Sequence, residues 1–161
     1  MKKLLFMALL LCMTSISANG QEVYQEILRL SKKAVSDPSK STQVKKINLF
    51  KVDELNYMAM KTKEVMPDSA VTVLDYQAFA LYEFINLYMD KMGKTDKKKE
   101  KTTILNIFKS ASINNPRFFD MDKPLVLSYY NNDNYLTQFS LDTDWVKALA
   151  EVRRMLRSNN M

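Results

Sequence analysis

Glycine is almost absent from this chain after residue 20, and that scarcity limits the folds that it can adopt. Gly93 is the only glycine in residues 21–161. Phosphate-binding loops and dinucleotide-binding folds need several glycines, because glycine adopts positive φ freely and lets the backbone approach a ligand closely. All-β folds also use glycine in their tight turns. The composition therefore predicts an all-α fold.

The longest apolar-rich stretch after the N-terminus covers residues 71–92 and predicts a central helix. Its apolar residues recur at steps of three and four, which is the spacing of one helix face. They are Leu74, Ala78, Leu81, Tyr82, Ile85, Tyr88, Met89 and Met92. A second apolar row beside them indicates packing on more than one side. We expect Asp68, Ser69 or Asp75 to cap the start of this helix, and Gly93 to end it in the left-handed conformation.

The same periodicity predicts further helices, which together form a single compact domain of five or six helices packed as antiparallel pairs. Four of them cover residues 22–36, 42–65, 98–113 and 143–157, and a short one covers 125–130. Ser41 is the expected N-cap of the second helix, Thr95 or Asp96 that of the fourth, and Asp142 or Asp144 that of the last. We expect Trp145 to fill the core against the central helix.

A TPR-like helical array is the alternative architecture. Phe108, Ala111 and Pro116 keep the spacing that closes a tetratricopeptide unit. The W-x₂-L-G signature of its first half is absent, and no period of 20–50 residues runs through the chain.

Residues 1–20 have the pattern of a secretory signal peptide. Lys2 and Lys3 precede a short apolar run, and Ala18 and Gly20 supply small residues before a cleavage site at Gln21. The run is too short to span a bilayer, which needs about 20 residues, so we predict no membrane span. The domain at 21–161 is expected to be exported to the periplasm or the outside of the cell. Lipidation at Cys12 is an alternative, although Leu11 stands where a lipoprotein signal has a small residue.

The chain has no histidine, and its one cysteine, Cys12, lies in the predicted signal peptide. Ser-His-Asp and Cys-His catalysis are therefore excluded for the exported chain. Zinc, copper and haem sites that use His or Cys ligands are excluded as well, and we predict no cofactor and no metal. Residues 131–134 carry oxygen ligands but fail the EF-hand pattern at its fifth and sixth positions, so a turn is expected there.

Carboxylates are the remaining catalytic groups. Asp120, Asp122, Asp142 and Asp144 form two pairs that a glycosidase-like hydrolase would need on facing walls of a cleft. Each pair lies beside a predicted helix start, where capping is the simpler explanation.

Aromatic residues concentrate between positions 118 and 139 and are the candidate binding residues. The cluster consists of Phe118, Phe119, Tyr129, Tyr130, Tyr135 and Phe139, and the first five are the named candidates. They either line a groove for a partner or form a satellite core under a long connection.

The basic segment 94–101 is the second candidate surface, and a solvated loop is its plainer interpretation. Without the signal peptide the net charge falls from +6 to +4 through the loss of Lys2 and Lys3. No aromatic residue interleaves the lysines of this segment, so bases would have no stacking platform. We predict no nucleic-acid partner.

Four short segments give the chain a familiar appearance. They are ANGQ at 18–21, KVDELNY at 51–57, INNPRF at 113–118 and LDTDW at 141–145. In these the chain resembles, over nearly all of its exported length, the small exported helical proteins of unknown function from Bacteroidetes gut anaerobes. The resemblance implies a periplasmic or outer-envelope setting and supplies no activity and no functional residues.

The leading hypothesis from the sequence is an exported, non-catalytic helical interaction module of the cell envelope that binds a protein or an envelope polymer. The alternative is a small carboxylate-based hydrolase that uses no metal, histidine or cysteine. The sequence leaves the oligomeric state open.

Overall fold

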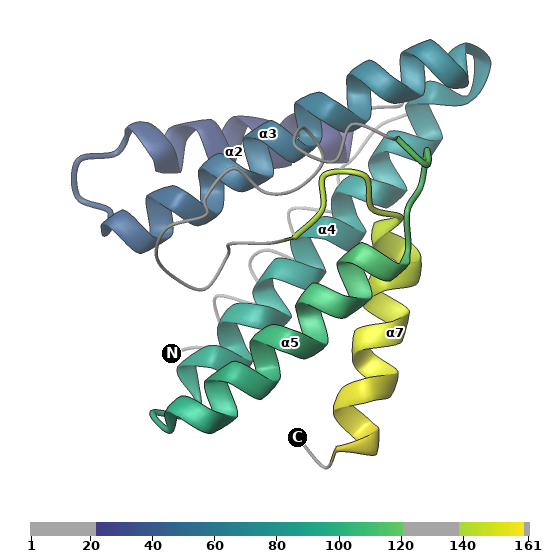
Figure 1. The fold of residues 1–161 in the computed structure, drawn as a ribbon. Helices are drawn as coiled ribbons and strands as arrows, with labels where there is room; N and C mark the ends of the chain where they lie inside the picture. The colour runs from purple at the N-terminus through teal and green to yellow at the C-terminus, as the bar shows by residue number, and fades with distance from the viewer. Residues whose placement is uncertain (1–21, 121–138, 160–161) are drawn as a thin grey trace.

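The computed structural model describes residues 22–120 and 139–159, and these form five α-helices and one 3₁₀ turn (Figure 1). The elements are α2 (Glu22–Ser36), α3 (Thr42–Val65), η2 (Pro67–Ser69), α4 (Ala70–Gly93), α5 (Lys98–Asn114) and α7 (Trp145–Ser158). The predicted all-α domain is confirmed, and the bounds of these five helices agree with the expected ones to within two residues. The predicted signal peptide with Cys12 and the short helix at 125–130 lie outside the described residues.

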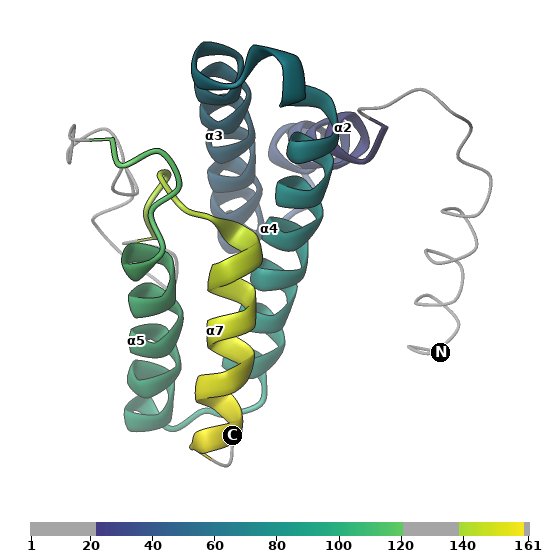
Figure 2. The same cartoon turned by 90° about the vertical axis from the view of Figure 1, so that its right-hand side faces the viewer.

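Helix α4 is the centre of the bundle. It contacts α2, α3, α5 and α7. Helices α2 and α3 form a hairpin at one end of α4 (Figure 1), while α5 and α7 run alongside its other half (Figure 2). In a repeat array each repeat contacts only the repeats next to it, whereas here one central helix contacts all four of the other helices. None of the described helices is long and apolar enough to cross a membrane.

Aromatic side chains fill the core where α4, α5 and α7 meet. The ring of Phe84 on α4 lies edge-on to Trp145 and to Phe108, with centroids 5.1 Å away in both cases, and to Phe139 at 5.4 Å. These are the edge-to-face contacts that aromatic quadrupoles favour. Trp145 is fully buried, which confirms its expected place against the central helix.

Two of the expected helix caps are confirmed. The Ser41 hydroxyl accepts the Val44 N–H at 3.4 Å. The Asp144 carboxylate accepts the Lys147 N–H at 3.2 Å. Each bond satisfies an amide that the first turn of a helix leaves without an intrahelical partner.

The expectation that Asp75 caps α4 is wrong. The helix begins at Ala70, directly after η2, so Asp75 lies inside it. Its carboxylate instead accepts the N–H of Tyr24 in the first turn of α2, at 2.9 Å. Asp75 therefore caps a different helix, and this pairing across 51 residues of sequence has no local pattern that could predict it.

The ends of the α4–α5 connection also differ from expectation. Gly93 has a negative φ, not the left-handed conformation. The Lys94 N–H bonds to the Lys91 carbonyl at 3.2 Å, so a tightened last turn closes the helix and needs no left-handed residue. At the start of α5 the N-cap position is Lys97, which makes no side-chain capping bond. The predicted cap Thr95 accepts the Lys97 N–H just before the helix.

Candidate functional site

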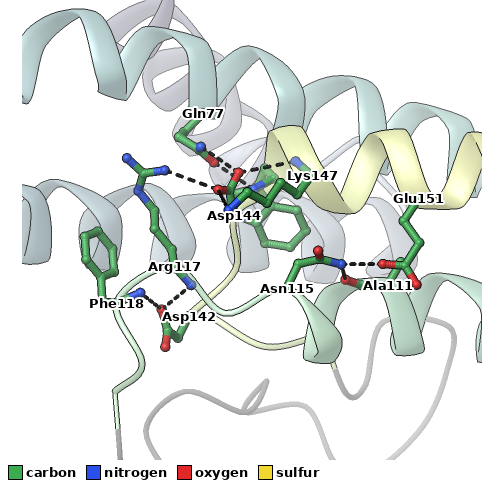
Figure 3. A network of polar contacts seen from close by, with 10 residues as sticks. Gln77, Ala111, Asn115, Arg117, Phe118, Asp142, Asp144, Lys147 and Glu151 are labelled. Carbon is green, nitrogen blue, oxygen red and sulfur yellow. Dashed lines mark hydrogen bonds and ion pairs between the residues drawn. The ribbon is translucent and has the colours of Figure 1, made fainter.

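The segment 139–144 returns across the end of α5 and fixes the loop that follows that helix (Figure 3). We call residues 115–120 the clamped loop. The carboxylate of Asp142 accepts the backbone N–H groups of Arg117, Phe118 and Asp120 at 3.0, 2.7 and 2.8 Å. Asp142 is buried, so these charge-assisted bonds are partly shielded from water. Sequence reasoning expected Asp142 to be a helix cap, and the structure assigns it to this loop instead.

Phe119 lies between Phe118 and Asp120, whose backbone N–H groups both donate to Asp142, but its own N–H does not donate to that carboxylate. Its φ is 56°, which makes it the single non-glycine residue with positive φ in the parts of the chain that the structure describes. An L-residue in the left-handed region costs about 1–2 kcal/mol. The side chain is 72 % exposed. The clamp therefore holds a strained backbone and directs an aromatic ring into solvent.

Phe118 is part of the support for this loop. It is half-buried and lies edge-on to Tyr57 of α3, with ring centroids 6.3 Å apart. The guanidinium of Arg117 lies over the Phe118 ring, 5.4 Å from the ring centre. The Tyr57 hydroxyl donates to Asp120 at 3.0 Å, and the Lys61 ammonium lies 3.2 Å from the same carboxylate. The second half of the clamped loop is thus anchored on α3.

The structure places two of the five predicted binding residues, and it places them differently. Phe118 packs inward, and Phe119 is exposed. Tyr129, Tyr130 and Tyr135 lie outside the described residues.

Asp144 joins α4 to α7 at the edge of the site (Figure 3). Its carboxylate accepts the side-chain amide of Gln77 at 3.1 Å, while the Gln77 carbonyl accepts the Trp145 N–H at 2.7 Å. Arg117 and Lys147 lie 3.8 and 3.4 Å from the same carboxylate. Burial acts to raise the pKa of Asp144, but the hydrogen bonds from Gln77 and Lys147 outweigh it and leave the pKa lowered.

Small polar side chains complete the attachment of this segment to α5. The Asn115 carbonyl accepts the Asp144 N–H at 2.8 Å, and the Asn115 side-chain amide donates to the Ala111 carbonyl and to Glu151. The hydroxyls of Ser112 and Thr143 lie 2.9 Å apart inside the protein. These bonds explain why the end of α5 and the start of α7 stay together.

Glu54 is a buried acid that sequence reasoning missed. It has no exposed surface, and one carboxyl oxygen accepts the indole N–H of Trp145 at 2.7 Å. The other oxygen has no hydrogen-bond partner in the described part of the chain. Burial raises the pKa of Glu54 well above its usual value; the Trp145 bond opposes this shift and the charge of Asp142 adds to it. The sequence holds one indication that Glu54 is buried: it lies four residues from both Phe50 and Met58, on the buried side of α3.

These contacts limit what the carboxylates can do chemically. Asp142 is occupied by backbone amides, and Asp144 caps a helix. Asp120 is held by Tyr57 and Lys61, and Asp122 lies outside the described residues. Each described member of the suggested catalytic pairs therefore has a structural role.

In the ranges 22–120 and 139–159, no group of three or more metal-ligating side chains is placed to hold an ion. No family model, curated protein or solved structure matches this chain. The function is therefore inferred from the site itself.

Proposed function

We propose that this protein is an exported, non-catalytic helical module of the cell envelope that binds a protein or an envelope polymer through the clamped loop. Phe119 is the contact residue in this proposal. The observation that carries it is a 72 % exposed phenylalanine at φ 56°, with Asp142 bonded to the backbone on both sides of it.

Two unfavourable features coincide at Phe119, and this coincidence supports a role in binding. The backbone conformation is strained, and the apolar ring is left in water. Strained residues persist where the surroundings over-determine them, and they concentrate at ligand-binding sites. Burial of the ring against a partner would recover about 25 cal/mol for each Å² of apolar surface, and large side chains of this kind anchor interfaces when they enter a pocket.

The rigidity of the clamped loop adds to the case. Its amides are bonded to Asp142, and its flanking side chains are fixed on α3. A contact residue that is already fixed loses little conformational entropy when a partner binds. Export and the envelope setting rest on the signal-like residues 1–20 and on the resemblance to small exported helical proteins.

The proposal is tested by capture of partners in the native envelope. Tagged protein is crosslinked in cells, and the captured material is identified by mass spectrometry. Co-sedimentation with isolated cell-wall polymer tests the polymer in parallel. We expect one reproducible protein partner or one polymer to be captured, and Phe119→Ala to abolish the capture.

Tyr76→Ala is the matched control, because Tyr76 is a 68 % exposed aromatic residue that belongs to α4 and not to the clamped loop. Tyr76→Ala should leave the capture intact. Equal loss in both variants, or full capture by Phe119→Ala, contradicts the proposed contact. Recovery of the uncleaved chain from the cytosol contradicts export.

A further inference from the structure

Glu54 has no exposed surface, and it lies close to the carboxylate that fixes the clamped loop. One of its oxygens accepts the Trp145 indole N–H at 2.7 Å, and Trp145 follows Asp142 by three residues along the chain. The negative charge of Asp142 is near enough to act on Glu54. The buried acid of α3 and the carboxylate that holds the loop therefore belong to one cluster of groups.

Among the described residues, no cation is paired with Glu54. In the ranges 22–120 and 139–159 it forms no ion pair, and its second oxygen has no hydrogen-bond partner. Lys51 lies three residues earlier on α3, but its ammonium lies over the Tyr82 ring, 5.7 Å from the ring centre. Burial penalises the charged form of a carboxyl group that has no such partner. The core is therefore built around the protonated form of Glu54, whose pKa burial raises.

Asp142 also forms no ion pair in the part of the chain that the structure describes. The neutral N–H groups of the clamped loop hold its charge. A second negative charge, on Glu54, would repel Asp142 inside the protein, where like charges interact more strongly than in water. Glu54 is fixed in helix α3, whereas Asp142 lies in the connection before α7. Asp142 can therefore reduce the repulsion by moving away, and this movement breaks its bonds to the loop.

Two other titratable groups of α3 lie near Glu54 in the sequence. Tyr57 follows it by three residues and donates to Asp120 at 3.0 Å. Burial, followed by the charge of Asp142, raises the pKa of Tyr57 above its usual value of 10, so its hydroxyl keeps its proton at pH 9 and below. Burial lowers the pKa of Lys51 to about 8. A variant that changes Glu54 alone separates its titration from that of Lys51.

We infer that the proton on Glu54 controls whether the clamped loop stays fixed to Asp142. While the proton is in place, the loop is held and Phe119 is exposed in one fixed position. When the proton is lost, two negative charges lie close together inside the protein, and Asp142 releases the loop. Glu54 is thus a positioning residue for the proposed binding loop. The inference rests on the proposed function for its consequence, which is the loss of partner binding as pH rises.

The experiment is amide hydrogen exchange, measured by NMR on the full-length exported chain between pH 5 and pH 9. Each rate is divided by the intrinsic rate at the same pH, because exchange itself accelerates as pH rises. We expect the protection of the three amides bonded to Asp142 to fall by up to about tenfold for each pH unit once Glu54 ionises. These amides are those of Arg117, Phe118 and Asp120. The chemical shift of the Trp145 indole proton, which bonds to Glu54, reports the ionisation over the same range.

The amide of Ser39 is the control within the same chain, because it also donates to a loop carboxylate, that of Asp37, at 2.8 Å. Asp37 lies in the turn between α2 and α3, and hydrogen bonds from the Ser39 hydroxyl and N–H lower its pKa, so it stays ionised. Protection at Ser39 should remain constant while that of the clamped amides falls. In Glu54→Gln the clamped amides should keep their protection at every pH, because Lys51 still titrates in this variant but residue 54 does not.

Constant protection of the clamped amides up to pH 9 in the natural protein would overturn the inference. An equal fall in Glu54→Gln would assign the opening to another group and overturn it as well. Partner capture, repeated at pH 6 and pH 9, separates this result from the proposed function. The natural protein should lose its partner at pH 9, whereas capture by Glu54→Gln should no longer depend on pH. If the natural protein captures nothing at either pH while its amides open, the proposed function fails and the control of the loop by Glu54 stands.

Discussion

At the scale of single residues, the backbone conformation of Phe119 is held by hydrogen bonds that its neighbours make to Asp142. Asp142 bonds to the amides on both sides of it, so the energy of three partly buried hydrogen bonds compensates for one strained residue. Position 119 therefore carries two separate features, a left-handed backbone and an exposed aromatic side chain. Different substitutions can test them independently.

Phe119→Gly should be more stable than Phe119→Ala by about 1 kcal/mol, because glycine adopts φ 56° without the steric cost that a Cβ brings. The same pair at Tyr76, inside α4, should show the opposite order by about 1 kcal/mol, because glycine is the poorer helix residue. Urea unfolding curves measure both differences. The same order at the two positions would contradict the left-handed backbone at Phe119.

Glu54 should make the stability of the folded state depend on pH. Its folded pKa is raised above the ordinary value of 4.5, so the folded protein binds this proton more tightly than the unfolded chain does. The Glu54 contribution to stability is thus fully present below about pH 4.5 and is lost as pH rises through the folded pKa, at up to about 1.4 kcal/mol per pH unit. Asp144, whose pKa is lowered, acts in the opposite sense.

Glu54→Gln keeps an acceptor for the Trp145 indole and cannot ionise. The stability of this variant relative to the natural protein should therefore increase as pH rises above about 4.5. Taking the difference cancels the contribution of Asp144. Denaturant unfolding between pH 4 and pH 8 provides the measurement, and a constant difference across that range would show that Glu54 ionises as easily in the fold as outside it.

At the scale of helices, the bounds were predictable because local patterns determine them. The apolar periodicity, the Ser41 cap and the proline after α2 all act within a few residues. The expected Asp75 cap failed for the opposite reason, because Asp75 serves an amide 51 positions away. The Gly93 expectation failed on a local detail, because a bond from the Lys94 N–H to the Lys91 carbonyl closes the helix without a left-handed residue.

Gly93→Ala should stabilise the protein by about 0.4–1 kcal/mol. The residue is helical with negative φ, and an added Cβ would meet no atom within 4 Å. Alanine then lowers the entropy of the unfolded chain without strain. Thermal unfolding is a sufficient measurement. A loss of stability would indicate the left-handed helix end that the sequence alone suggests.

At the scale of the whole molecule, the fold and the site differ in how far the sequence predicts them. Burial of one apolar face in each helix is enough to specify an α-helical bundle around α4. The clamped loop depends on Asp142, whose bonded amides lie 22 to 25 positions earlier in the chain. The aromatic cluster makes Phe118 and Phe119 equal candidates in the sequence, and only the structure distinguishes the supporting Phe118 from the exposed Phe119.

Trp145 links the core to the buried polar groups, so its removal should affect the whole domain. Trp145→Ala should cost about 3–5 kcal/mol of unfolding free energy, because a fully buried ring leaves a cavity. Trp145→Phe keeps much of the packing and removes only the indole donor to Glu54, so it should cost less, about 1–3 kcal/mol. A loss below about 1 kcal/mol for the alanine variant would contradict the central place of this ring.

The central claim is that the clamped loop displays Phe119 to a partner, and site-specific photocrosslinking tests it most directly. A photoreactive phenylalanine derivative is placed at position 119 in one protein and at position 76 in another, because both positions expose an aromatic side chain. After irradiation of living cells, we predict one discrete crosslinked product from position 119 and none from position 76. The same products from both positions, or none from position 119, would contradict the claim.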